Sequence, residues 1–356
     1  MDPLLLQDAR IAVDAMGGDH APDAAIRGAA RALAEADGFR CILVGDERKI
    51  SSVLSRCEHP ASRVEIAHTD EAIGMDEPAR EAILKKPRAS VLVGAEMLGH
   101  DGADALVSAG STGALVLGAA RHLPMIPGTS RSGLAALIPT RRRNPEDRGF
   151  VLLIDVGATL RVSAQQLSHF ATMGAAYLRA ALGVPSPRVG LLNIGEEATK
   201  GDETLRAAYG IISKMNDIRF AGNVEGKDVP AGNVDVVVCD GFTGNVVLKM
   251  YEGVASVAMD LAREAGRDNL LWSVGLRLLR PAIDKLRRKT DFAEYGGAPI
   301  LGFERLVVKA HGRSNARAVR SAILVAREAL KNDLLQRITS DVTKINETFF
   351  AQAAGL

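Results

Sequence analysis

The stretch VDVVVCDGFTGN, residues 234–245, contains the pattern that decides the fold. A mainly apolar run from Val234 to Cys239 leads into Asp240, two glycines and Asn245, which we expect to cap a helix. Because the apolar residues are consecutive rather than alternating, the run predicts a strand that is covered on both faces. Such strands belong to parallel sheets that lie between helical layers.

The same pattern, a short run of Val, Ile and Leu that leads through Asp or glycine into a helix, recurs along the chain. It predicts an α/β fold with a mainly parallel sheet, organised as one domain over residues 1–356. Ligands of such sheets gather beyond the carboxyl ends of the strands. The other expected strands are Ile11 to Asp14, Cys41 to Gly45, Val64 to His68, Ala105 to Ala109, Ala135 to Ile138, Val151 to Val156, Val189 to Ile194, Phe220 to Gly222 and Leu306 to Lys309.

Composition narrows the class of protein. The 356 residues are 47% hydrophobic and carry a net charge of +1, which argues against a nucleic-acid-binding protein. The cysteines Cys41, Cys57 and Cys239 are few, odd in number and widely spaced, so we expect free thiols in a reducing compartment. The sequence shows neither a secretory signal nor an apolar stretch long enough for a membrane span, which favours a cytoplasmic protein.

Five segments at expected strand ends combine glycines or hydroxyls with charged or amide side chains. Backbone N–H groups in such turns and at helix N-termini bind anions, although each segment alone also fits an ordinary turn, cap or solvated loop. We expect all five to meet at one edge of the sheet. The candidates for anion binding are Asp14, Gly17, Gly18, Ser111, Thr112, Glu196 and Glu197. The candidates for catalysis are His20, Asn193, Lys200, Asp240, Asn245, Lys309 and His311.

Residues 245–289 contain no expected strand and predict two helices joined near Gly266, which project from the sheet. The part from Trp272 to Lys289 alternates apolar with basic residues, as a helix in a lipid interface does. A helix that forms a dimer, with a solvated basic end, fits the same pattern. The candidate membrane residues are Leu271, Trp272, Val274, Leu276, Leu278 and Leu279.

Seven strings, in this order along nearly the whole chain, resemble the bacterial acyl carrier protein:phosphate acyltransferase family, the PlsX family. The resemblance implies a Rossmann-like three-layer α/β/α fold related to phosphotransacetylases and isocitrate dehydrogenases, with a protruding helical hairpin. It also implies a homodimer, without a cofactor, that associates peripherally with the inner face of the cell membrane. The strings are VDAMGGDHAP, GSTGA, VGLLNIGEEATKGDE, GNVEGKD, VDVVVCDGFTGNVVLK, DFAEYGGAPILG and VKAHGRSNA.

The activity that the resemblance implies is transfer of a fatty acyl group from acyl carrier protein to inorganic phosphate, which yields acyl phosphate for phospholipid synthesis. No enzyme nucleophile is required, because phosphate is already anionic and a thiol leaves readily. We expect Lys200 and Lys309 to supply positive charge to phosphate held by the glycine turns. Asn193 and Asn245 would orient the reacting groups, and His20 or His311 would transfer a proton.

One segment departs from the family pattern. After LIDVGA the family usually has Asn, an apolar residue, Asp and Cys, whereas this chain has Thr159, Leu160, Arg161 and Val162. If this loop contacts phosphate or the carrier protein, the exchange of a carboxylate for a guanidinium changes affinity or rate.

Alternatives from other classes stay open at this stage. A short-chain phosphotransacetylase and a noncatalytic scaffold that binds acyl carrier protein at the membrane both fit the fold. A dehydrogenase is less favoured, because no strand is followed by the Gly-x-Gly-x-x-Gly fingerprint, and no metal-ligand spacing is visible. The basic run 141–143 is either a solvated loop or a contact for the acidic carrier protein.

Overall fold

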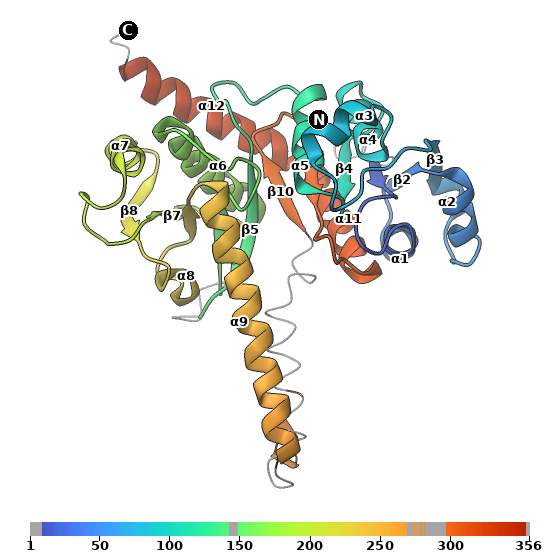
Figure 1. Ribbon diagram of the computed structural model, residues 1–356. Helices are drawn as coiled ribbons and strands as arrows, with labels where there is room; N and C mark the ends of the chain where they lie inside the picture. The colour runs from blue at the N-terminus through green and yellow to red at the C-terminus, as the bar shows by residue number, and fades with distance from the viewer. Residues whose placement is uncertain are drawn as a thin grey trace.

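A single sheet of eleven strands runs through the described protein, in the order β3-β2-β1-β4-β11-β10-β5-β6-β9-β7-β8. Its two ends, β3 and β8, lie on opposite sides of the molecule (Figure 1). The computed structural model describes residues 9–141, 149–268 and 297–353, with a few positions between 274 and 281. The strands are β1 (Ala9–Asp14), β2 (Phe39–Gly45), β3 (Val64–His68), β4 (Ala105–Ser108), β5 (Gly133–Pro139), β6 (Phe150–Ile154), β7 (Arg188–Leu192), β8 (Arg219–Val224), β9 (Val236–Val238), β10 (Ala298–Leu301) and β11 (Leu306–Lys309).

Helices cover both faces of the sheet, which confirms the expected three-layer α/β/α arrangement. On one face lie α1 (Asp23–Glu35), α2 (Glu47–Leu54), α6 (Ala164–Leu182), α7 (Glu203–Ile212), α11 (Ala316–Lys331) and α12 (Leu334–Ala353). On the other lie α3 (Ala79–Lys85), α4 (Ser90–Gly99), α5 (Thr112–His122), α8 (Asp228–Ala231) and α9 (Gly241–Asp268). A 3-10 turn, Ala61–Arg63, precedes β3.

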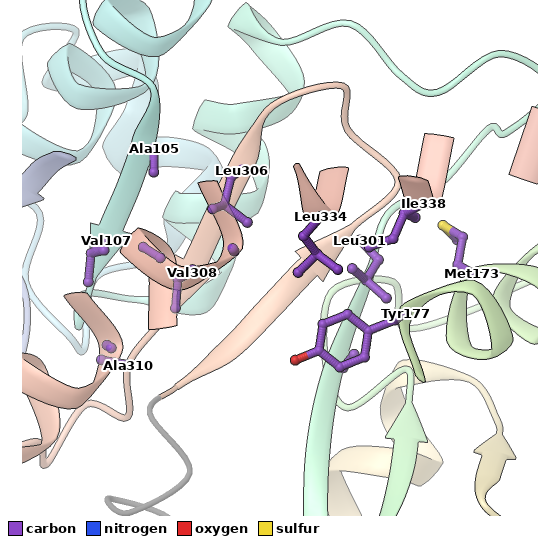
Figure 2. Packing of buried hydrophobic residues seen from close by; sticks show 14 of the residues in the cluster. Ala105, Val107, Met173, Tyr177, Leu301, Leu306, Val308, Ala310, Leu334 and Ile338 are labelled. Atoms are coloured by element: carbon purple, nitrogen blue, oxygen red, sulfur yellow. The ribbon is translucent and has the colours of Figure 1, made fainter. Parts of the chain in front are cut away.

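Consecutive apolar residues in a strand pack alternately against the two helical layers. Val236 and Val238 belong to the core on the α6 face, whereas Val237 belongs to the core on the α9 face. All three are fully buried, as the apolar run predicts. Where β10 meets α6 and α12, Leu301 and Leu334 lie close to Tyr177 (Figure 2).

Strand direction corrects one prediction about the sheet. Among the described strands, the pairings β11 with β10, β10 with β5, and β5 with β6 are antiparallel, and the other neighbours are parallel. The sheet is therefore mainly parallel, as expected. Because three pairings in the middle of the sheet are antiparallel, however, β6, β9, β7 and β8 run in the opposite direction to β1, β4 and β11. The two groups of strands end at opposite edges, so the prediction that all five polar segments meet at one edge is wrong.

The ten expected strands are present, and β10 is the one that sequence reasoning missed. It has only four residues and contains Pro299, which argues against a strand because proline lacks the N–H group of a ladder bond.

Helix α9 begins five residues earlier than expected. The carboxylate of Asp240 accepts hydrogen bonds from the N–H group of Thr243, at 2.9 Å, and from its hydroxyl, so Asp240 caps the helix. Asn245 was expected to be the cap but lies one turn inside α9. The helix continues through Gly266 and projects far beyond the body (Figure 1).

The remainder of the expected hairpin lies mostly outside the described residues. Within the described part of the chain, no helix combines the length and the apolarity that a bilayer crossing requires.

Candidate active site

The centre of the site is a row of three side chains across neighbouring parallel strands. Asp14, Ser108 and Lys309 end β1, β4 and β11, and the sheet register places Ser108 between the other two. The Ser108 hydroxyl donates to Asp14 Oδ2 at 2.7 Å, and the Ser90 hydroxyl, from α4, donates to Asp14 Oδ1 at 2.6 Å. The row thus holds a carboxylate and an ammonium group at one edge of the sheet.

Burial shifts the ionisation of both charged groups. Asp14 is only 2% exposed, and the loss of hydration raises the pKa of its carboxyl group, although Ser90, Ser108 and Lys309 oppose the shift. Lys309 is 7% exposed, and burial lowers its pKa to about 8, against the attraction of Asp14 and Asp19. A lysine with this pKa is mostly charged at neutral pH but loses its proton under mildly alkaline conditions.

Two glycine turns close over Asp14. A side chain at Gly17 would lie 2.3 Å from Asp14 Oδ2 and 2.7 Å from the Gly110 nitrogen, so only glycine permits this approach. The Gly110 N–H group donates to the Ser108 hydroxyl at 3.0 Å. The carboxylate of Asp14 therefore joins the turn after β1 to the turn after β4. It supports both turns, and in the described part of the chain it is not among the residues that line the cavity described below.

Helix α9 links the two edges of the sheet. At its start, no side chain fits at Gly244, where a Cβ atom would meet the backbone oxygen of Asp155. The Asn245 side chain donates to the Val156 carbonyl oxygen at 2.9 Å, which anchors the first turn. Two turns later, Glu252 Oε1 lies 3.7 Å from Nε2 of His311 at the other edge.

The hydrogen bonds of His311 indicate its tautomer. Its Nδ1 atom accepts from the backbone N–H group of Arg313 at 3.2 Å, so the neutral ring carries its proton on Nε2, which faces Glu252. Burial lowers the pKa of His311, and the cations Lys309, Lys249 and Arg313 lower it further, while Glu252 raises it. The imidazole is thus arranged as a hydrogen-bond donor rather than as a base.

A cavity of about 660 Å³ opens beside these residues. Its polar part comes from the loops after β1, β4 and β11 and from α9. Its apolar part comes mainly from β5, β10 and α9, with further residues from α11 and from the segments before α3 and after β6 and β11. The polar lining consists of Asp19, Thr112, Asn245, Lys249, Glu252, Lys309, His311, Gly312, Arg313, Ser314 and Asn315. The apolar lining consists of Met75, Leu134, Ala136, Leu137, Val156, Leu248, Ala255, Ala298, Ala310 and Ala318, and Gly297 completes it.

The N-terminus of α5 faces this cavity through Thr112. Ser111 precedes the helix but makes no capping hydrogen bond from its side chain, so the first N–H groups of α5 are left for another partner. Helix α11 differs, because Asn315 caps it by accepting from the N–H groups of Arg317 and Ala318. Together with Lys309, α5 provides an anion-binding corner.

Several predicted site residues lie together here. Asn245, Lys309, His311 and Thr112 line the cavity, and Asp14 and Gly17 lie directly beneath its turns. Gly18 packs against the Gly312 carbonyl oxygen. His20 is exposed and is not part of the lining in the described structure.

Sequence reasoning missed four charged residues of the lining, namely Asp19, Lys249, Glu252 and Arg313. Lys249 and Glu252 follow Asn245 by four and seven residues, a helical spacing that puts all three on one face of α9. That spacing is the signal that would have identified them.

The other candidates lie at the opposite edge, after β7 and β9. Asn193 is buried and shapes its own loop, since its Nδ2 donates to the Lys200 carbonyl oxygen at 3.1 Å. Asp240 is occupied as the cap of α9. Lys200 and the carboxylates of Glu196 and Glu197 are exposed, and within the described chain none of them lines the cavity. Their part in catalysis stays a prediction.

The loop that departs from the family pattern lies beside the start of α9. The buried carboxylate of Asp155 accepts N–H groups of Leu134, Gly157, Ala158 and Thr159 at 2.6 to 2.9 Å. The Thr159 hydroxyl donates to the Ser132 carbonyl oxygen, and the Thr159 carbonyl accepts from Gly241. Thr159 thus supports the loop, whereas Arg161 is exposed.

The thiols are poorly suited to catalysis. Cys41 and Cys239 are buried, and burial raises the pKa of Cys41 to about 12 and that of Cys239 well above its ordinary value. Among the described residues, no cluster of three or more His, Cys, Asp or Glu side chains is placed to hold a metal ion.

Comparison with known proteins shows the family. Residues 9–337 match the family described as "Fatty acid synthesis protein". A phosphate acyltransferase from Acetivibrio thermocellus is 42% identical over 331 residues, covering 93% of this chain and 96% of that protein. One from Gloeothece citriformis is 41% identical over 330 residues, covering 93% and 92%. A phosphotransacetylase from Streptococcus pyogenes shares the fold, with a TM-score of 0.61 at 17% identity over 92% of this chain and 96% of that one.

Proposed function

We propose that this chain, which belongs to the PlsX family of phosphate acyltransferases, moves a fatty acyl group from acyl carrier protein to inorganic phosphate. The product would be an acyl phosphate that enters phospholipid synthesis. The observation that carries this proposal is the cavity, in which the anion-binding corner adjoins the apolar lining. A thioester with a long chain and an inorganic oxyanion need these two environments side by side.

Phosphate is proposed to bind between Lys309 and the N-terminus of α5, where Thr112 faces the cavity. Lys249 and Arg313 add positive charge to the same corner. A phosphate oxygen attacks the thioester carbon, the carbon–sulfur bond breaks, and sulfur leaves as a thiolate. Lys309 stabilises the negative charge that develops on the carbonyl oxygen.

His311 is proposed to assist the leaving group. Its Nε2–H group can donate a hydrogen bond to the negative charge that develops on the departing sulfur, while its Nδ1 accepts from the Arg313 N–H group. His20, which is exposed, is a weaker candidate for this step. Asn245 is held by Val156 at the cavity wall, where its remaining amide atoms can orient the thioester.

The direct test is incubation of the purified protein with long-chain acyl carrier protein and radiolabelled phosphate. We expect release of the carrier thiol that depends on phosphate, together with a labelled acyl phosphate. Thiol release at the same rate without phosphate would contradict the proposal. Activity confined to acetyl thioesters would favour a short-chain phosphotransacetylase, and absence of any turnover would favour a scaffold.

A homodimer through α9 is part of the proposal. The residues Phe242, Val246, Met250, Val254, Val257 and Leu261 are each more than half exposed and follow one face of the helix. From Met250 onward their 4-3-4 spacing is that of a coiled-coil seam, which a second copy of the same helix would cover.

The dimer test uses a matched pair of variants. Met250→Asp with Val257→Asp should give a monomer in light scattering after gel filtration. Ser256→Asp, on another face of the same helix, should leave the mass unchanged. A wild-type protein that is monomeric at micromolar concentration would remove the dimer from the proposal.

Membrane contact is proposed for residues 271–279. Val274, Leu278 and Leu279 are helical and well exposed, whereas Leu271, Trp272 and Leu276 lie outside the described residues. The same peripheral contact would receive a product whose tail prefers lipid. In liposome flotation, a Trp272→Asp and Leu276→Asp double variant should bind less than wild type. Equal binding would count against this contact.

A further inference from the structure

A carboxylate lies in the corner where phosphate is proposed to bind. Asp19, in the turn after β1, lines the cavity. Its N–H group donates to the carbonyl oxygen of Gly312, in the turn after β11, at 2.9 Å. A Cβ atom at the preceding Gly18 would lie only 3.0 Å from that of Ala109, whose carbonyl oxygen accepts from Lys309 Nζ at 3.4 Å. The charge of Asp19 opposes the burial that lowers the pKa of Lys309, so the two groups lie near each other.

The carboxylate of Asp19 is left for a ligand, whereas two other carboxylates near the cavity are engaged. The hydroxyls of Ser90 and Ser108 hold the carboxylate of Asp14. The Glu252 carboxylate lies 3.7 Å from Nε2 of His311. Within the described part of the chain, the Asp19 side chain neither accepts a hydrogen bond nor forms an ion pair. Its oxygens can therefore accept from a molecule that enters the cavity.

A carboxylate beside an anion site discriminates against oxyanions that cannot donate to it. An ionised carboxylate has only acceptor atoms, so an anion that binds next to it must bring a proton of its own. Inorganic phosphate keeps at least one proton at neutral pH, whereas sulfate, which has a similar size and charge, has none. A P–OH group can donate to the carboxylate, but sulfate would meet it with acceptor against acceptor and with like charges.

We propose that Asp19 accepts a hydrogen bond from the P–OH group of the bound phosphate and thereby selects phosphate over sulfate. Lys309 and the first N–H groups of α5 hold the oxygens that carry the negative charge. With the P–OH group turned toward Asp19, an oxygen without a proton is left to attack the thioester. This inference rests on the proposed phosphate site and adds the residue that determines its anion specificity. A site built around a substrate hydroxyl rejects the analogue that lacks it.

The test compares wild type with Asp19→Asn at neutral pH and constant ionic strength. Calorimetry without an acyl donor measures the Kd of phosphate and the Kd of sulfate. In wild type, sulfate should bind about 10- to 100-fold more weakly than phosphate, the range expected for a hydrogen bond to a charged group. The amide of asparagine can donate to sulfate, so in the variant the two Kd values should differ by less than about threefold. In thiol release, the ratio of the sulfate Ki to the phosphate KM should fall in the same way.

A matched control is Asp23→Asn, because Asp23 is an exposed aspartate of α1 that is not part of the cavity lining in the described structure. It should keep the wild-type ratio of the two Kd values. Arsenate provides a second control, because it also carries a proton at neutral pH and should bind to wild type as phosphate does.

Three results would overturn the role of Asp19. They are equal affinity of wild type for sulfate and phosphate, arsenate that binds as weakly as sulfate, and a folded Asp19→Asn protein that keeps the wild-type ratio. If Asp19→Asn does not fold, Asp19→Ser, which removes the same carboxylate, takes its place in the comparison. Absence of phosphate-dependent thiol release in wild type would instead reject the proposed function, and the calorimetric ratio would still decide whether Asp19 selects the anion.

Discussion

Replacement of Lys309 by methionine is the sharpest test of whether the anion-binding corner acts in catalysis. Methionine has similar length but no charge, so the buried wall of the cavity stays filled while the ammonium group is lost. Removal of one preorganised group that stabilises an oxyanion costs about 100- to 1,000-fold in rate, and we expect a loss of kcat/KM in this range. The assay is phosphate-dependent thiol release, with thermal unfolding as the control for folding.

The pH profile gives this prediction a second readout. Because burial lowers the pKa of Lys309 to about 8, the side chain is about nine-tenths protonated at pH 7 and loses its charge above pH 8. Wild-type activity should therefore decline as pH rises through 8. In Lys309→Arg the guanidinium stays charged, so any activity that remains should not decline in this window. The methionine variant should lack the decline as well.

Two results would contradict this role of Lys309. A methionine variant within threefold of wild type would show that the ammonium group does not act in the rate-limiting step. A decline near pH 8 that persists in both variants would assign this titration to another group.

Four further outcomes follow from the same geometry. Asp14→Asn removes the charge that raises the pKa of Lys309, so the alkaline decline in activity should move to lower pH; an unmoved profile would argue against their coupling. Gly244→Ala should destabilise the fold by about 1–3 kcal/mol or more in urea unfolding, because a Cβ atom meets Asp155, whereas Gly210→Ala in α7, with open space around it, should gain up to about 1 kcal/mol. Between pH 8 and 10, Lys309 binds a proton in the unfolded chain but not in the folded chain. As pH rises through this range, the free energy of unfolding of wild type should therefore increase by up to about 1.4 kcal/mol per pH unit relative to that of Lys309→Met. Lys309→Met should cost more activity than Lys200→Ala, since Lys200 is exposed outside the cavity, and the reverse order would move the reaction to the other edge.

The strands could be predicted from the sequence, because a strand that is buried on both faces is a run of consecutive apolar residues. The run 236–238 is apolar at every position, and all three residues are buried in β9. The direction of a strand relative to its neighbours is not visible in such a run, because the apolar residues are the same in a parallel and an antiparallel pairing. The three antiparallel pairings around β5 and β10 were therefore not foreseen, and with them the division of the predicted site between two edges.

Residues in the motifs at strand ends were easier to predict than residues further along a helix, although Asp19 and Arg313, which follow β1 and β11, were also missed. Lys309 and His311 were found because they end β11. Lys249 and Glu252 were missed because a charged residue on a helix looks like solvated surface until the packing of α9 is known. Asp14 was predicted from its place at the end of β1, but the hydroxyls of Ser90 and Ser108 that hold its carboxylate were not.

The central claim is that phosphate reacts at the edge of the sheet formed by β1, β4 and β11. A crystal structure of the protein with inorganic phosphate and a nonhydrolysable acyl thioester analogue tests this claim directly. We expect the anion beside Lys309 Nζ and the first turn of α5, with the acyl chain along the apolar side of the cavity. An anion held instead by the loop of Asn193 and Lys200, with the cavity unoccupied, would contradict it.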